Sequence, residues 1–225
     1  MTSHEEKLLS IYNEKYVSFE GFKNLVTHHF LASSELSQGS FLIIHSVKSR
    51  MKSTNGLIDK IRRKNKDSLV VTEENFFNQI TDFCGVRVIH LYQNDFPKIH
   101  RFIMKLVDEG EWFLNEQVKA YTWDPETKPV FDKLSINTEQ KDSLYTSVHY
   151  VIRSREGMFT SCEIQVRTLF DEIWGEVDHK INYPHPCESI SCQEQLKVLA
   201  KLSSTGTRLL DSVNRTFTEF NRQEP

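Results

Sequence analysis

The stretch Cys162-Glu-Ile-Gln-Val-Arg-Thr-Leu-Phe-Asp-Glu-Ile-Trp-Gly-Glu-Val-Asp-His-Lys-Ile-Asn-Tyr183 carries the clearest pattern in this chain. Its opening residues alternate between apolar and polar, which is the period of a β-strand. On such a strand Glu163, Gln165 and Arg167 share one face. From Leu169 onward the apolar residues recur at helical spacing. The stretch therefore predicts a strand with a polar face that runs directly into an amphipathic helix.

Composition bounds the class of protein. A chain of 225 residues fits one large domain or two small ones. Its 28 Lys plus Arg and 31 Asp plus Glu nearly balance, so overall charge predicts no polyanionic partner. Cys84 and Cys162 suit reduced core thiols of a cytoplasmic protein, whereas Cys187 and Cys192 near His185 are too loosely spaced to indicate a metal site. Without a signal-peptide pattern or a long apolar run, secretion and membrane insertion are disfavoured.

Hydrophobic periodicity predicts an α+β fold, in which a mixed sheet of about five strands is flanked by helices. Helices capped by Thr54 or Asn55, and by Thr72, are expected between the strands. The last helix is expected to be interrupted at Gly206, and the last two strands to form a hairpin. The main helices are expected at residues 5–36, 95–109 and 193–220, and the strands at 41–47, 86–89, 118–123, 145–153 and 162–167, with a loop after 123.

Basic residues gather in one segment of this slightly acidic chain. Between Lys48 and Lys66 the only acidic residue is Asp59. Such a patch is typical of a phosphate-binding surface, and it is equally typical of a solvated helix face. The basic residues are Lys48, Arg50, Lys52, Lys60, Arg62, Arg63, Lys64 and Lys66.

Two carboxylates stand at the ends of separate apolar strands. If these strands are neighbours, Asp82 and Glu163 form a natural site for a hard divalent cation that carries nucleotide phosphates. Nearby cations suit a polyphosphate, and Arg87 and Tyr145 offer planar groups on which bases stack. Taken singly, each residue has an ordinary explanation as a helix cap, a solvated lysine or a hydrogen-bonded strand residue. Their order along the chain is more specific than any one of them.

That order resembles the synthetase domain of RelA/SpoT-type alarmone synthetases. The resemblance covers roughly residues 41–183 and rests on four separate motifs. These motifs are Arg50-x-Lys52 followed by Lys60, then Asp82-x-x-Gly85-x-Arg87, then Lys141-x-x-x-Tyr145-x-Ser147-x-His149, and finally Glu163-x-Gln165-x-Arg167 with a later His179.

The resemblance implies a nucleotidyltransferase-like fold and a pyrophosphokinase that moves the β,γ-diphosphate of ATP to the 3′-hydroxyl of a guanine nucleotide, GDP or GTP. It implies Mg²⁺ as cofactor, held by the catalytic pair Asp82 and Glu163, with Glu163 also the base. Phosphoryl transfer indeed needs a metal ion, cations and positioning more than covalent help. The resemblance further assigns Arg50, Lys52, Lys60 and Arg87 to ATP and Lys141, Tyr145, His149, Gln165 and Arg167 to the acceptor site.

Two positions depart from the family pattern. Leu144 precedes the stacking Tyr145 where Gly is usual, and a side chain there restricts the backbone or narrows the pocket. Gly56 stands where a phosphate-contacting Ser is common, so one hydroxyl donor is missing. The first departure puts guanine-nucleotide selectivity in doubt.

The length suggests a single-domain small alarmone synthetase over residues 1–225, in which helices at 1–38 and 184–225 flank a catalytic core at 39–183. The chain has no His-Asp dipeptide, so the hydrolase domain of the long family members is not expected. Some small members are toxins that pyrophosphorylate the 3′ end of tRNA. In that alternative Arg62, Arg63 and Lys64 would bind RNA, and an antitoxin would be a partner. A catalytically silent nucleotide sensor and a homo-oligomer also stay open.

Overall fold

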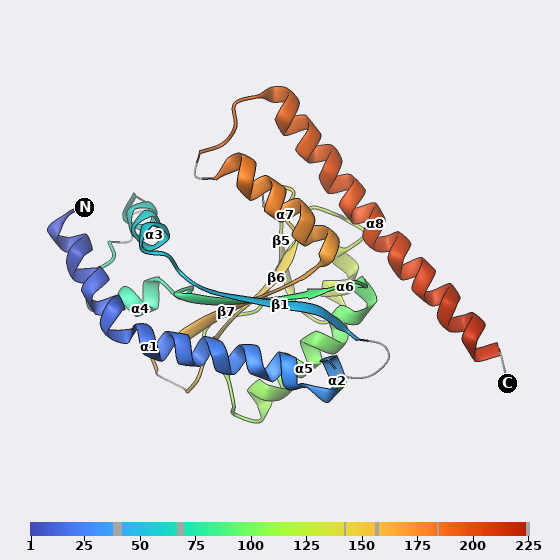
Figure 1. Ribbon diagram of the computed structural model, residues 1–225, viewed down its shortest axis with the longest axis horizontal. Coiled ribbons are helices and arrows are strands. Elements are labelled where there is room, and N and C mark those ends of the chain that lie inside the picture. Colours follow the sequence, from blue (N-terminus) through green and yellow to red (C-terminus); the bar gives the residue numbers. More distant parts are fainter. Residues whose placement is uncertain (38–41, 67–69, 142, 156–157, 184, 224–225) are drawn as a thin grey trace.

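A mixed seven-stranded sheet organises the computed structural model of this chain (Figure 1), which describes residues 1–37, 42–66, 70–141, 143–155, 158–183 and 185–223. The strand order is β1-β2-β7-β6-β4-β5, and β3 pairs with β6. The α+β class is confirmed, and the two strands beyond the expected five are the very short β3 and β5. The strands are β1 (Ile44–Met51), β2 (Cys84–His90), β3 (Phe113–Leu114), β4 (Lys119–Tyr121), β5 (Asn137–Glu139), β6 (Ser147–Arg153) and β7 (Ser161–Thr168).

The centre of the sheet is the parallel pair β2 and β7. Gly85 of β2 lies opposite Glu163 of β7. Antiparallel strands flank this pair, with β1 beside β2 and β6 beside β7 in the expected hairpin. The turn expected at 155–157 lies partly outside the described residues. Along β7 the apolar Ile164 and Val166 are buried in the core, so the intervening polar side chains face the opposite side.

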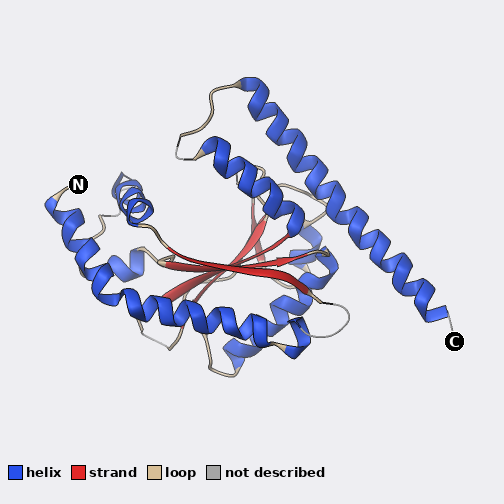
Figure 2. Ribbon diagram, in the orientation of Figure 1, coloured by secondary structure: helices blue, strands red, loops and turns tan. Residues whose placement is uncertain are grey.

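Helices cover both faces of the sheet, and Figure 2 shows α1 and α7 on opposite sides of it. The expected N-terminal helices are α1 (Ser3–Ala32) and α2 (Ser34–Ser37). Thr2 and Glu5 close a capping box at the start of α1, which then packs against β1, β2 and β7. The helix expected at 95–109 is α5 (Phe96–Asp108), after the short 3₁₀ helix η1 (Gln93–Asp95). In the described part of the chain, no helix is long and apolar enough to span a membrane.

The C-terminal helices α7 (Leu169–Asn182) and α8 (Ile190–Gln223) pack against each other. The indole nitrogen of Trp174 donates to the carbonyl of Leu196 at 3.0 Å. The expected interruption at Gly206 is wrong, because α8 is continuous and Gly206 instead makes room for the Phe170 ring. Four apolar residues farther along α8 stay exposed, namely Leu209, Val213, Phe217 and Phe220.

Several expected boundaries shift for local reasons. Strand β1 begins at Ile44 and continues to Met51, which places Arg50 on the strand; Phe41 lies outside the described residues. Helix α3 (Thr54–Lys66) begins at Thr54, the first of the two expected caps, and Ser53 caps it instead. The Ser53 hydroxyl accepts from the backbone N–H of Gly56 at 3.2 Å.

Two further expectations are wrong after β1. Thr72 opens a turn instead of a helix, because its hydroxyl and backbone pair with Asn75, and Asn75 precedes the short α4 (Phe76–Gln79). The loop expected after residue 123 contains α6 (Lys128–Asp132) as well as β5. Pro129 lies in the first turn of α6, where a missing N–H is tolerated.

The contact between Gly206 and Phe170 gives a stability prediction. A Cβ at Gly206 would lie 2.6 Å from the Phe170 ring, whereas a Cβ at Gly21 of α1 would meet nothing within 4 Å. We expect Gly206→Ala to destabilise the protein by about 1–3 kcal/mol through overpacking. The control Gly21→Ala should stabilise it by about 1 kcal/mol through helix propensity. Equal gains in thermal unfolding temperature for both variants would contradict the packing of α7 on α8.

Candidate active site

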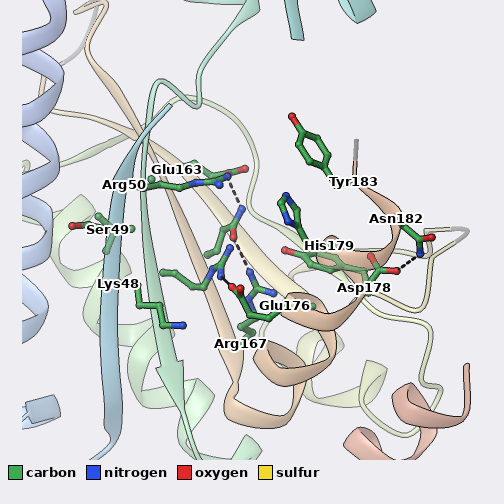
Figure 3. Close-up of a pocket in the computed structure, with 16 residues that line it drawn as sticks. Lys48, Ser49, Arg50, Glu163, Arg167, Glu176, Asp178, His179, Asn182 and Tyr183 are labelled. Atoms are coloured by element: carbon green, nitrogen blue, oxygen red, sulfur yellow. Dashed lines mark hydrogen bonds and ion pairs between the residues drawn. The ribbon is translucent and has the colours of Figure 1, made fainter. Parts of the chain in front are cut away.

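A cavity of about 610 Å³ lies between the central strands and α7. Strands β1, β2 and β7 form one wall, and the side chains of α7 form the other, as Figure 3 shows. The α7 wall includes Glu176, His179 and Tyr183, of which the last two stack at 4.6 Å between ring centroids. The predicted site residues that the structure brings together along this cavity are Arg50, Arg87, Tyr145, Glu163, Gln165 and Arg167.

Glu163 is held at both carboxylate oxygens. His149 Nδ1 lies 3.1 Å from Oε1, and the Gln165 amide nitrogen donates to Oε2 at 2.7 Å. Burial favours the neutral acid, but the His149 and Gln165 contacts outweigh it and lower the pKa of Glu163. An ionised carboxylate only accepts, so His149 Nδ1 carries a proton and donates to Oε1.

A second hydrogen bond continues from His149. Burial raises the pKa of Tyr145, so its hydroxyl keeps a proton, and this hydroxyl lies within hydrogen-bond distance of His149 Nε2, at 3.1 Å. Tyr145 lines the cavity, whereas Lys141 and His149, which are also predicted for the acceptor, do not. The Tyr145 ring therefore lies between the cavity and these two residues.

Asp82 lies two residues before β2, with Lys52 and Lys60 on its carboxylate. The two ammonium groups approach its oxygens at 2.8 and 2.7 Å. Burial opposes ionisation here too, yet Lys60 and Lys52 lower the pKa of Asp82 to about 2. The lysines predicted for phosphate and the aspartate predicted for metal thus form one cluster, and the charge on Asp82 also acts on Glu163.

The two arginines predicted to bind ATP, Arg50 and Arg87, differ in their surroundings. Arg50 is exposed and makes no ion pair with any described residue. Arg87 lies deeper, and its Nη1 donates to Glu172 at 2.9 Å and to Glu176 at 2.7 Å. Glu172 and Glu176 were expected only as the polar side of a helix, since periodicity does not reveal which distant cation a helix face meets.

Tyr121 of β4 contacts two residues predicted for the acceptor, but the sequence pattern did not single it out. The Lys141 ammonium lies 3.7 Å from the centre of its ring and 5.0 Å from that of Tyr145. The edge of His149 meets Tyr121 at 4.9 Å between centroids. Alternation within the strand expected at 118–123 would have placed Tyr121 on one face, but nothing in the sequence shows that β4 pairs with β6.

The basic patch is divided by its ion pairs. Arg62 binds Glu5 of α1 through two hydrogen bonds of 2.8 and 3.1 Å. These bonds, together with the backbone N–H of Thr2, lower the pKa of Glu5 to about 2. Lys48 binds Glu172. Neither Arg63 nor Lys64 has an ion-pair partner among the described residues. Of the three positions predicted for RNA, Arg62 is therefore held in an ion pair within the protein.

Residues 49–188 match the family described as "Region found in RelA / SpoT proteins", which is more than half of the chain. The chain belongs to the RelA/SpoT family. A curated relative, GTP pyrophosphokinase YwaC of Bacillus subtilis (strain 168), is 27% identical over 140 residues, or 62% of this chain. That match spans only 59% of the relative's length.

Solved structures show the same fold. The small alarmone synthetase 1 of Bacillus subtilis superposes with a TM-score of 0.69 at 15% identity, over 93% of this chain and 99% of its own. A GTP pyrophosphokinase family protein of Streptococcus pneumoniae gives a TM-score of 0.69 at 18% identity, over 97% of each chain. The Bacillus enzyme is also known bound to its product pppGpp and to AMPCPP, with TM-scores of 0.66 and 0.62.

The Asp82 cluster predicts a pH-dependent stability. The pKa of Asp82 falls from its ordinary 3.8 to about 2 on folding, so its ion pairs stabilise the protein above pH 3.8 and lose this effect as the pH falls toward 2. We expect Lys60→Met to destabilise the protein at pH 7 by about 1–3 kcal/mol, because Asp82 loses a charged partner.

Denaturant unfolding at pH 7 and pH 3 measures this effect. The difference from the parent protein should shrink at pH 3, and adding Asp82→Asn to Lys60→Met should recover part of the loss at pH 7. An unchanged stability of Lys60→Met at pH 7 would show that this pair does not hold the cluster together.

Proposed function

We propose that this protein is a pyrophosphokinase that transfers the β,γ-diphosphate of ATP to the 3′-hydroxyl of GDP or GTP and releases AMP. The observation that carries the proposal is the ionised Glu163, held at both oxygens in a nucleotide-sized cavity. Arginines line this cavity, and the charge of Asp82, which carries the two lysines, acts on the same carboxylate. These are the parts that diphosphate transfer needs: cations for phosphate, a positioned base and a face for each nucleotide.

On the ATP side, Arg50 and Arg87 stack on adenine while Lys52 and Lys60 hold the phosphates. Both lysines rest on Asp82 at hydrogen-bond distance before any nucleotide arrives. Each ammonium has three donors, so a lysine that keeps one bond to Asp82 still has donors for phosphate oxygens. The aspartate therefore preorganises the lysines instead of neutralising them completely.

The reaction joins the acceptor 3′-oxygen to the β-phosphorus of ATP. The bond between this phosphorus and the oxygen that bridges to the α-phosphate breaks, and AMP leaves with that oxygen. The proton of the 3′-hydroxyl passes to an oxygen of Glu163, because a carboxylate within hydrogen-bond reach of a hydroxyl can accept its proton as a general base. His149 and Gln165 keep Glu163 ionised and in place until the acceptor arrives.

The donor set fits Mg²⁺, which we propose as the cofactor. Asp82 and Glu163 both have lowered pKa values and lie close enough for their charges to interact. Among the described residues no three His, Cys, Asp or Glu side chains form a complete metal cage. Two carboxylates with the remaining ligands from phosphate and water are what Mg²⁺ prefers. When bound, this ion neutralises phosphate charge during transfer.

A guanine nucleotide is the acceptor that the relatives favour, since the Bacillus enzyme of the same fold binds pppGpp and AMPCPP. Here Tyr145 stacks on the acceptor base and Lys141 stands beside it for phosphate. The alternative acceptor is the 3′ end of tRNA. The observation that favours it is that Arg63 and Lys64 on α3 have no ion-pair partner among the residues that the structure describes. Leu144, half-buried before Tyr145, bears on the same choice.

One experiment tests the reaction and the acceptor together. The protein is incubated with Mg²⁺ and γ-labelled ATP, with GDP, GTP, ATP or deacylated tRNA offered separately. We expect label on GDP or GTP with stoichiometric AMP, and a loss of about 10²–10⁴-fold in single-turnover rate for Glu163→Gln. Nucleotide affinity should fall less, because Arg50, Lys52 and Lys60 remain.

Each other outcome has a definite meaning. Label on tRNA alone would replace the guanine nucleotide by RNA as acceptor. No label on any acceptor would support a nucleotide sensor. Near-normal turnover by Glu163→Gln would remove the proposed base.

The two roles of Tyr145 are separable. Tyr145→Ala removes the stacking ring and should raise the KM for the acceptor by a factor that corresponds to about 1–3 kcal/mol, with ATP affinity nearly intact. Tyr145→Phe keeps the ring and removes only the hydroxyl that is hydrogen-bonded to His149, so its acceptor KM should stay closer to that of the parent. Steady-state kinetics with either substrate varied measures both. Equal loss of ATP affinity in Tyr145→Ala would place this ring on the ATP side.

A further inference from the structure

One buried carboxylate, Glu172, binds a cation from each of three strands. Lys48 of β1 lies 2.9 Å from its Oε1, and Arg167 Nε of β7 lies 3.2 Å from its Oε2. Arg87 of β2 donates from Nη1 to both oxygens, at 2.9 and 3.1 Å. The Glu172 side chain is only 4% exposed. A single acid on α7 thus ties together the sheet wall of the nucleotide cavity.

Glu172 is ionised in this position. Its burial opposes the charge, but the hydrogen bond from Lys48 and the charges of Arg167 and Arg87 lower its pKa. It also lies in the first turn of α7, where the helix dipole favours a negative charge. The carboxylate is therefore a fixed anion that the strand cations share.

The contact with Arg87 constrains one corner of the guanidinium. Every hydrogen bond that the structure gives this side chain comes from Nη1, two to Glu172 and one to Glu176. The guanidinium is planar, so fixing one corner on both oxygens of a carboxylate limits its tilt. Its flat faces are not used by these bonds, and the residue lines the cavity.

We propose that Glu172 is a positioning residue for the adenine nucleotide, which holds the Arg87 guanidinium in the cavity wall so that adenine stacks on it. This inference rests on the proposed function, because the role of Arg87 toward adenine belongs to that proposal. Glu172 itself touches no reacting atom, and its effect passes through Arg87. It adds a residue that the sequence motifs do not contain.

Glu176 offers a matched comparison on the same helix. It accepts from the same Arg87 Nη1 at 2.7 Å, one turn after Glu172. Its side chain is 59% exposed, and its one cation partner among the described residues is Arg87. Solvent screens such a pair, so its loss should leave Arg87 close to its place.

Binding of AMPCPP, an ATP analogue that cannot release AMP because a methylene replaces the bridging oxygen, tests the inference by calorimetry. We expect Glu172→Gln to weaken AMPCPP binding roughly 10- to 100-fold, the range of a lost charged hydrogen bond. The KM for ATP should rise in parallel, while the KM for the acceptor changes little. Glu176→Gln should have a clearly smaller effect, about threefold or less.

A double-mutant cycle decides whether Glu172 acts through Arg87. In an Arg87→Ala background, Glu172→Gln should cause little further loss of AMPCPP affinity, since the guanidinium to be positioned is gone. Full additivity would overturn the inference. So would a Glu172→Gln protein with lower thermal stability but normal AMPCPP affinity, because that result describes a purely structural ion pair.

Two further outcomes are defined in advance. If Glu172→Gln does not fold, Glu172→Asp replaces it, because this variant keeps the charge but has a shorter side chain. Glu172→Asp should weaken AMPCPP binding in the parent protein and not in the Arg87→Ala background. Equal losses of AMPCPP affinity in the two backgrounds overturn the inference. If no acceptor is labelled although AMPCPP binds and the cycle is non-additive, the inference stands while the proposed transfer fails. If the parent protein does not bind AMPCPP, the inference fails.

Discussion

The parallel pairing of β2 with β7 is the constraint on which the site depends. Its register sets Gly85 beside Glu163, and the antiparallel β1 sets Arg50 on the other side of the same glycine. Groups more than a hundred residues apart in sequence are thereby aligned across neighbouring strands. A shift of one residue in β7 would turn Glu163 and Gln165 into the core and Ile164 into the cavity.

The second organising feature is a set of buried or half-buried carboxylates that form ion pairs with lysines and arginines. Asp82 holds Lys52 and Lys60, and Glu172 holds cations from β1, β2 and β7. Removing one partner from such a group leaves a charge without compensation, which is strongly unfavourable. In the proposed function, the same arrangement keeps the cations in place before a polyphosphate binds, so little reorganisation is required when it does. On that proposal, stability and ligand binding rest on the same ion pairs.

The sequence was sufficient for the features that depend on local pattern. Alternation in residues 162–167 identified β7, and the order of polar motifs identified the family and the residues that meet in the cavity. Strands β3 and β5 were missed because two or three residues carry no readable period. The continuity of α8 was missed because Gly206 is explained by the distant Phe170 ring.

The sequence also could not show which residues contact each other across distant parts of the chain. Arg62 was predicted to bind RNA in the alternative acceptor, and its sequence neighbourhood does not show that it pairs with Glu5 in the first turn of α1. The role of Glu172 was missed for the same reason, since a helix period marks it only as polar. Tyr121 required knowing that β4 lies beside β6. In each case the information lies in the pairing of elements and not in the residue's own neighbourhood.

Binding of Mn²⁺ as a substitute for Mg²⁺, followed by electron paramagnetic resonance with AMPCPP present, tests most directly whether the register of β2 and β7 builds one cation site. The account predicts one tightly bound Mn²⁺ per chain with AMPCPP, and weaker binding after either Asp82→Asn or Glu163→Gln. Mn²⁺ affinity that is the same in the parent and in both variants would contradict it.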